Sequence, residues 1–187
     1  MPSPLDVFRS DLLTGHVALI TGGGTGICKG IAAGYARLGA DVCIVSRKQE
    51  TLDATAAELR AYGRKVIGIA ADVRKPDEIG KAIAQTVEQL GSLDTLVNGA
   101  AGNFLAPAAG LSPNGFGTVI DIDLKGTFNA ARAAFEHLQK SGRGLILNIS
   151  ATLHYHGTPL QIHASAAKAG VDAITKNLAV EWGTFGI

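Results

Sequence analysis

The stretch Thr21-Gly22-Gly23-Gly24-Thr25-Gly26-Ile27-Cys28 decides how the rest of the chain is interpreted. It follows an apolar run, Val17-Ala18-Leu19-Ile20, that is typical of a buried strand, and the apolar residues after it recur at helical spacing. A glycine-rich turn in this position lets the backbone approach a pyrophosphate and directs the N–H groups of the helix N-terminus toward that anion. The turn alone is a weak signal, but its place between strand and helix favours phosphate binding over a plain turn.

The composition indicates one globular domain. The chain has 187 residues, of which 47% are hydrophobic and 18% are charged, and its formal net charge is +1. A chain of this length can bury a sizeable core, and its charge balance makes no case for a nucleic acid or a membrane as partner. We therefore expect a single domain over residues 1–187.

The sequence also carries information about the compartment. Residues 1–13 include Asp6, Arg9 and Asp11, so a signal peptide's apolar stretch is missing there, and no run reaches transmembrane length. Cys28 and Cys43 fall in a predicted helical turn and a predicted strand, which is poor placement for a disulfide. We expect a cytoplasmic protein, with the peroxisome as the alternative for a eukaryotic source.

Strand-like and helical patterns alternate along the chain. The predicted strands cover residues 16–21, 41–46, 65–70, 93–98 and 144–150, and the predicted helices cover 26–38, 49–62, 76–90, 113–139 and 160–182. Glycines follow four of these helices, as they do at helix C-termini. The alternation predicts an α/β fold, a Rossmann-like doubly wound parallel sheet with helices on both faces. Because residues 182–187 look like a helix stop and the start of another strand, we expect the natural chain to continue.

In such a sheet, ligands bind beyond the carboxyl ends of the strands. Ser46-Arg47-Lys48 follows the second predicted strand. An acid here would hold the ribose of NAD, whereas Arg47 can grip a 2′-phosphate bidentately, so the pattern favours NADP(H) as cofactor. The alternative is a solvated basic pair at the start of a helix.

Two further motifs lie at the same predicted edge. Asp72-Val73-Arg74 follows the third strand, where Asp72 faces an adenine amine or caps the next helix. Asn98-Gly99-Ala100-Ala101-Gly102 follows the fourth, where small residues let a ribose or a nicotinamide lie on the backbone, unless it is an ordinary turn. The predicted cofactor-binding residues are Thr21, Gly22, Gly24, Thr25, Gly26, Ile27, Ser46, Arg47, Lys48, Asp72, Val73, Asn98, Gly99, Ala100, Ala101 and Lys168.

These motifs, with Lys168 behind them in the right order and spacing, resemble the short-chain dehydrogenase/reductase family over essentially the whole chain. The resemblance implies that the family's last two strands and its acyl-pocket loop follow Ile187. One departure is Cys28, which replaces the family's third glycine. That glycine allows close helix–strand packing, so we expect Cys28 to push the helix outward or to weaken dinucleotide binding.

The catalytic positions depart further from the family pattern. The family's tyrosine, four residues before Lys168, is Ala164 here; its serine falls on Ala151, and its asparagine falls on Asp123. The phenol and hydroxyl that normally serve a carbonyl oxygen are therefore absent. We expect very slow interconversion of alcohols and ketones, because no group of suitable pKa is placed to exchange a proton with that oxygen.

Several longer runs carry a closer resemblance: residues 101–105, Asp121-Ile122-Asp123, residues 148–153, His163-Ala164 and residues 178–183. They are similar to one branch of the family, the peroxisomal-type 2,4-dienoyl-CoA reductases. The resemblance implies that NADPH reduces a 2,4-dienoyl-CoA thioester to a 3-enoyl-CoA thioester, with an acyl-CoA as partner.

Asp123 and Lys168 are the predicted catalytic residues. Lys168 can hold the nicotinamide ribose and keep positive charge near a dienolate, and Asp123 can pair with it and orient a water that protonates the α-carbon. The alternative for Asp123 is a helix-surface carboxylate, but its apolar neighbours favour a cleft.

Four residues are predicted to contact substrate. Asn103 can donate to the thioester oxygen, Phe104 can pack on the acyl chain or the nicotinamide, and a free guanidinium at Arg74 suits CoA phosphates unless it is surface charge. His163 contacts the thioester or a pantetheine amide, or is a satisfied histidine at a helix start. His154, His156 and His163 lack further ligands with convincing spacing, so no metal site is expected.

Two other functions stay open at this point. One is a reductase for another enoyl or ketoacyl thioester, with its acid supplied by His163, Tyr155 or a later segment. The other is a non-catalytic NADP-binding protein, which the residues at positions 28, 151 and 164 support. The resemblance also implies a homodimer or a homotetramer, built on the helices predicted at 113–139 and 160–182.

Overall fold

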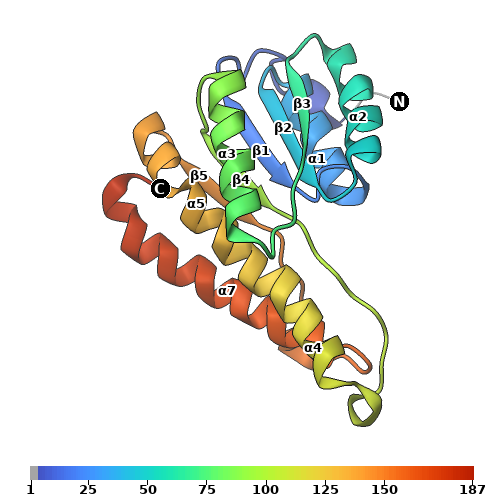
Figure 1. Ribbon diagram of the computed structural model, residues 1–187. Helices are drawn as coiled ribbons and strands as arrows, with labels where there is room; N and C mark the ends of the chain where they lie inside the picture. Colours follow the sequence, from blue (N-terminus) through green and yellow to red (C-terminus); the bar gives the residue numbers. More distant parts are fainter. Residues whose placement is uncertain (1–3) are drawn as a thin grey trace.

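A five-stranded parallel sheet forms the centre of the molecule (Figure 1). The computed structural model describes residues 4–187, and residues 1–3 of the predicted domain lie outside the described residues. The sheet has the order β3-β2-β1-β4-β5. Its strands are β1 (Val17–Thr21), β2 (Asp41–Ser46), β3 (Val66–Ala70), β4 (Thr95–Asn98) and β5 (Leu145–Asn148).

Helices connect the strands and cover both faces of the sheet (Figure 1). The α-helices are α1 (Gly26–Arg37), α2 (Gln49–Leu59), α3 (Pro76–Leu90), α4 (Pro113–Val119), α5 (Gly126–Ser141), α6 (Leu153–His156) and α7 (Ile162–Trp182). Short 3₁₀ turns occupy Pro4–Val7, Arg60–Tyr62, Ala108–Gly110 and Gly183–Phe185. Among the described residues, no helix is both long and apolar enough to cross a membrane.

Successive residues of each strand point to opposite faces, so the sheet has a core on each side. On one side, Ile20 and Ile44 pack with α1 and α2; on the other, Leu19 and Cys43 pack with α3 and α5. Parallel strands buried on both faces need continuous apolar runs, which is why Val17–Thr21 is buried throughout. The predicted α/β fold is confirmed.

The helix predicted over 113–139 is wrong as a single α-helix. A π-helical segment, Ile120–Lys125, separates α4 from α5. Such segments change which side chains face inward, and they are frequent at functional sites. Asp123 lies inside this one and is buried.

Other boundaries move by a few residues. The helix predicted from 160 begins at Ile162, because Leu160 has a positive φ of 66° that no helix continues through. The short helix α6 was not predicted. The helix predicted over 49–62 is α-helical only to Leu59 and ends in a 3₁₀ turn before Gly63, which has the left-handed φ expected of a glycine there.

Candidate active site

A cavity of about 610 Å³ opens at the carboxyl edge of the sheet. It is bounded by the N-terminus of α1 and by the segments that follow β2, β3 and β4. Its lining residues are Gly22, Gly24, Thr25, Ile27, Cys28, Val45, Ser46, Arg47, Lys48, Thr51, Ala71, Asp72, Val73, Gly99, Ala100, Ala101, Gly102, Ile122, Ile149 and Lys168. Most of the predicted cofactor residues are therefore brought to one place, as the carboxyl edge of a parallel sheet requires.

The glycine turn leaves the N-terminus of α1 open to this cavity. Thr25 is the N-cap residue, and its side chain makes no capping hydrogen bond, so the first N–H groups of the helix remain available to an anion. Gly22 has φ +71°, and a Cβ on it would lie 2.8 Å from the carbonyl oxygen of Gly99. Only glycine fits this close approach, and the resulting cradle suits a pyrophosphate.

Cys28 occupies space that Gly99 leaves free. A Cβ on Gly99 would lie 2.1 Å from the Cys28 sulfur, so the thiol packs directly on the backbone after β4. Burial raises the pKa of the Cys28 thiol, and the charge of Lys168 opposes that rise. The sulfur thus forms part of the cavity wall, and α1 still begins at Gly26.

Three predicted cofactor residues, Thr21, Gly26 and Asn98, do not line the cavity. Thr21 is buried beneath it, and its Oγ1 accepts hydrogen bonds from the backbone N–H groups of Gly99 (3.0 Å) and Ala100 (3.2 Å). The amide of Asn98 donates to Asn148 at 2.9 Å across the sheet. Thr21 therefore supports the loop after β4, and Asn98 links β4 to β5. Their contact with the cofactor stays a prediction.

The far end of the cavity is basic. Ser46, Arg47 and Lys48, from the end of β2, line it together with Thr51, which the sequence analysis missed. Thr51 lies on the first turn of α2, and no pattern in the sequence distinguishes it from a helix-surface residue. This set offers hydroxyls and cations to a phosphate.

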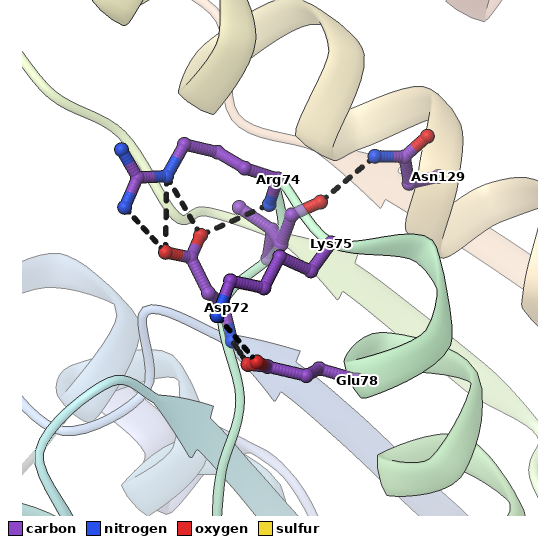
Figure 2. A network of polar contacts seen from close by, with 6 residues as sticks. Asp72, Arg74, Lys75, Glu78 and Asn129 are labelled. Carbon is purple, nitrogen blue, oxygen red and sulfur yellow. Dashed lines mark hydrogen bonds and ion pairs between the residues drawn. The ribbon is translucent and has the colours of Figure 1, made fainter.

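A network of polar contacts fixes the segment after β3 (Figure 2). The guanidinium of Arg74 donates to both carboxylate oxygens of Asp72, with Nε 3.0 Å from each. Glu78 accepts from the backbone N–H of Asp72 at 2.9 Å, and Asn129 donates to the carbonyl oxygen of Val73 at 2.9 Å. The expectation of a free guanidinium at Arg74 is therefore wrong, because an adjacent buried carboxylate holds it. A contact of Arg74 with CoA phosphates stays a prediction, and it would require this ion pair to open.

Lys168 is a buried lysine that lines the cavity, and the buried carboxylate of Asp123, which does not line it, lies next to Lys168. Asp123 accepts a hydrogen bond from the backbone N–H of Gly102 at 2.7 Å, and its other oxygen lies 3.5 Å from Nζ of Lys168. Nζ of Lys168 also donates to the carbonyl oxygen of Ile149 at 2.8 Å. Asp121, two residues earlier, is only partly buried and pairs with Lys125, so of the two carboxylates Asp123 is the one that is turned inward.

Burial dominates the electrostatics of this pair. It raises the pKa of Asp123 above its ordinary value, while the Gly102 N–H and the charge of Lys168 oppose the rise. The raised pKa makes the Asp123 carboxyl hold a proton more readily than an exposed aspartate does. Ala164 is buried near this pair and packs with Val119 and Ala167, so no phenol occupies the family's tyrosine position.

None of the four predicted substrate residues lines the cavity, and Asn103, Phe104 and His163 contact neighbouring side chains. The amide of Asn103 donates to Gln161 at 2.6 Å, and the ring of Phe104 lies 4.5 Å from that of His163. Phe104 is 43% exposed, whereas His163 is fully buried, so a direct substrate contact of His163 would require Phe104 to move. Neither ring nitrogen of His163 has a hydrogen-bond partner among the described residues.

The other two histidines, His154 and His156, lie on α6, whereas His163 lies on α7. His154 lies 3.0 Å from a carboxylate oxygen of Asp172, and the hydroxyl of Tyr155 donates to the same carboxylate at 3.1 Å. This hydrogen bond raises the pKa of Tyr155, which makes the phenol a poorer acid. Within residues 4–187, no three His, Cys, Asp or Glu side chains cluster as metal ligands.

Known proteins resemble this chain closely. Residues 16–187 match the family model of the short chain dehydrogenases. The peroxisomal 2,4-dienoyl-CoA reductase [(3E)-enoyl-CoA-producing] of Arabidopsis thaliana is 50% identical over 98% of this chain and 63% of its own length, and that of Danio rerio is 47% identical over 97% and 61%. The chain thus spans about three fifths of these relatives.

A solved structure agrees in fold. A short chain dehydrogenase from Bacillus anthracis str. 'Ames Ancestor' superposes with a TM-score of 0.87 at 44% identity, covering 92% of this chain and 72% of the other. The chain belongs to the short chain dehydrogenase family.

Proposed function

We propose that the protein uses NADP(H) to reduce a 2,4-dienoyl-CoA thioester to a 3-enoyl-CoA thioester in the oxidation of unsaturated fatty acids. The observation that carries the proposal is the buried pair of Lys168, which lines the cavity, and Asp123 next to it, with alanine at positions 151 and 164. The names of the Arabidopsis and Danio relatives support the same reaction.

The residues of the cavity fit a nicotinamide dinucleotide. The N-terminus of α1 would hold the pyrophosphate, and Arg47 with Ser46 and Lys48 would hold a 2′-phosphate on the adenosine ribose. Lys168 would hold the ribose at the other end. The bound reduced cofactor would supply the hydride that adds to the far end of the diene.

The chain's own residues would manage the charge and the proton. Negative charge spreads to the thioester oxygen as the diene is reduced, and the ammonium group of Lys168 stabilises it in a site shielded from water. Asp123 and Lys168 would orient a water molecule that protonates the α-carbon. Because protonation occurs at carbon, this chemistry needs neither the tyrosine nor the serine of a carbonyl reductase.

Substrate contacts complete the proposal. Asn103 and Phe104, on the loop after β4, would meet the thioester oxygen and the acyl chain, with His163 behind Phe104. The relatives' names also support the peroxisome as the alternative to a cytoplasmic location. We further propose a homodimer or a homotetramer built on α5 and α7.

The test is NADPH consumption by the full-length protein with three substrates: 2,4-hexadienoyl-CoA, crotonyl-CoA and acetoacetyl-CoA. We expect consumption only with the dienoyl thioester, and a 3-enoyl product. Consumption with acetoacetyl-CoA or crotonyl-CoA alone would favour a different thioester reductase. NADPH binding without turnover of any of the three would favour a non-catalytic NADP-binding protein.

A further inference from the structure

A carboxylate sits in the same cavity as the basic residues proposed to hold a 2′-phosphate. The side chain of Asp72 is 11% exposed and lines the cavity together with Arg47. The two charges interact, because Arg47 contributes to lowering the pKa of Asp72. The negative charge of Asp72 would therefore repel a 2′-phosphate held by Arg47.

Arg74 cancels that charge. Its guanidinium approaches both oxygens of Asp72, and the hydrogen bonds from Arg74 are the largest cause of the lowered pKa of Asp72 (Figure 2). Arg74 itself does not line the cavity. It neutralises the Asp72 carboxylate from outside the cavity, so the net charge of the pair at the cavity wall is close to zero.

Besides the Asp72 carboxylate, which accepts from the backbone N–H of Arg74 at 3.0 Å, two other side chains hold the backbone of this segment. Glu78 holds the N–H of Asp72, and Asn129 holds the carbonyl oxygen of Val73. Val73 also packs against Gly126, where a Cβ would lie 2.6 Å from a Val73 methyl carbon. Arg74 side-chain bonds in the described segment go to the carboxylate alone. Glu78, Asn129 and the packing of Val73 therefore hold the segment after β3 without the guanidinium of Arg74.

We propose that Arg74 is a specificity-determining residue that favours NADP(H) over NAD(H) by neutralising Asp72. This inference rests on the proposed use of NADP(H) and adds a residue outside the cavity to it. Without the guanidinium, the carboxylate would repel a 2′-phosphate and leave a free ribose 2′-hydroxyl unaffected. In this proposal Arg74 acts on the cofactor only through the charge of Asp72, and it touches neither the cofactor nor the reacting atoms.

The test compares affinities for NADPH and NADH by fluorescence titration of the full-length protein. We expect Arg74→Gln to lower the ratio of NADPH affinity to NADH affinity about tenfold, the scale of one uncompensated charge near a protein surface. Arg74→Lys keeps the positive charge and should keep most of the ratio. Lys75→Gln is the matched control. The substitution removes one cation from the same segment, and that cation pairs with Glu78 at 2.7 Å. It should leave the ratio unchanged.

A double variant separates an indirect role from a direct phosphate contact. In Asp72→Asn no carboxylate remains to be neutralised, so adding Arg74→Gln to it should change the ratio less than twofold. A full loss of preference in the double variant would mean that Arg74 contacts the phosphate itself. Equal weakening of NADPH and NADH in Arg74→Gln would mean a structural role. Either result overturns the inference.

The outcome for the wild type separates this inference from the proposed function. A wild type that binds NADH as tightly as NADPH contradicts the proposed NADP(H) use and this inference with it. A wild type that prefers NADPH, with an Arg74→Gln variant of unchanged ratio, contradicts the inference alone.

Discussion

Nζ of Lys168 lies 3.5 Å from a carboxylate oxygen of Asp123, and the two side chains are only 10% and 2% exposed. A buried pair of this kind contributes little to stability after its desolvation cost, so its presence calls for a functional explanation. The backbone N–H of Gly102 donates to Asp123, and the carbonyl oxygen of Ile149 accepts from Lys168. The pair is thus fixed in place before any ligand binds, which is what preorganised stabilisation of charge requires.

A second buried carboxylate, Asp94, is expected to serve stability. It accepts from the N–H of Val17 at 2.7 Å and from Arg143 Nε at 2.8 Å. Asp94→Asn should lower the free energy of unfolding by about 2 kcal/mol at neutral pH, the scale for hydrogen bonds to a charged group. Urea unfolding measures it, and Asp121→Asn, at an exposed pair with Lys125, should cost less than about 0.5 kcal/mol.

The same carboxylate predicts a pH dependence. Burial raises the pKa of Asp94, but hydrogen bonds from Arg143 and Val17 outweigh it, and the pKa lies below its ordinary value. Its stabilisation is therefore present above the unfolded-state pKa of about 4 and is lost as the pH falls through the lower folded-state value. The difference in free energy of unfolding between the wild type and Asp94→Asn should shrink over that acid range. A difference that stays constant would contradict the assignment.

The contact between Cys28 and Gly99 predicts a coupled pair of substitutions. Gly99→Ala should destabilise the protein by about 2 kcal/mol, because its Cβ would lie 2.1 Å from the Cys28 sulfur. Adding Cys28→Ala removes that sulfur, and the next contact, with the Thr21 carbonyl oxygen, is 3.2 Å. Thermal unfolding of the two single variants and the double variant should show recovery in the double. Simple additivity would show that the two residues do not meet.

Cys28 also lines the cavity, where the family pattern has glycine. Cys28→Gly should tighten NADPH binding about threefold, because the thiol narrows the space beside the N-terminus of α1. Fluorescence titration measures the change, with Cys43→Ala as a control, since Cys43 is buried in the sheet away from the cavity. Weaker binding by Cys28→Gly would show instead that the thiol contributes to the cofactor site.

Phe104 predicts an effect on substrate binding. Its ring is 43% exposed and covers His163, so it offers an apolar surface beside the cavity. Phe104→Ala should raise KM for 2,4-hexadienoyl-CoA about tenfold, the scale of one buried aromatic contact, with kcat changed much less. Tyr62→Ala, at a similarly exposed ring outside the cavity, should leave KM unchanged. A Phe104→Ala variant with normal KM would remove Phe104 from the substrate site.

The sequence predicted the sheet well because each strand is a short apolar run bounded by glycine or polar residues. The strand over 41–46 is correct to the residue, and the others differ by one or two at either end. The π-helical segment escaped prediction, since Ile120–Lys125 has an ordinary helical composition; in the fold it packs against α7.

The site was predictable where residue types carry the signal. Asp123 and Lys168 stood out because ionisable residues are rare among apolar neighbours, and the structure brings them together. The partners of Arg74 and Thr21 escaped prediction for the opposite reason. Only the fold reveals them: Asp72 across a turn, and the backbone of Gly99 in the loop after β4.

The most direct test of the account is turnover of 2,4-hexadienoyl-CoA with NADPH by the full-length wild type, Asp123→Asn and Lys168→Ala, with NADPH affinity measured for each. We predict that turnover falls at least a hundredfold in both variants, the scale of a lost proton-transfer group or charge stabiliser, while Asp123→Asn still binds NADPH. Wild-type turnover in either variant would contradict the central claim that this pair carries the reaction.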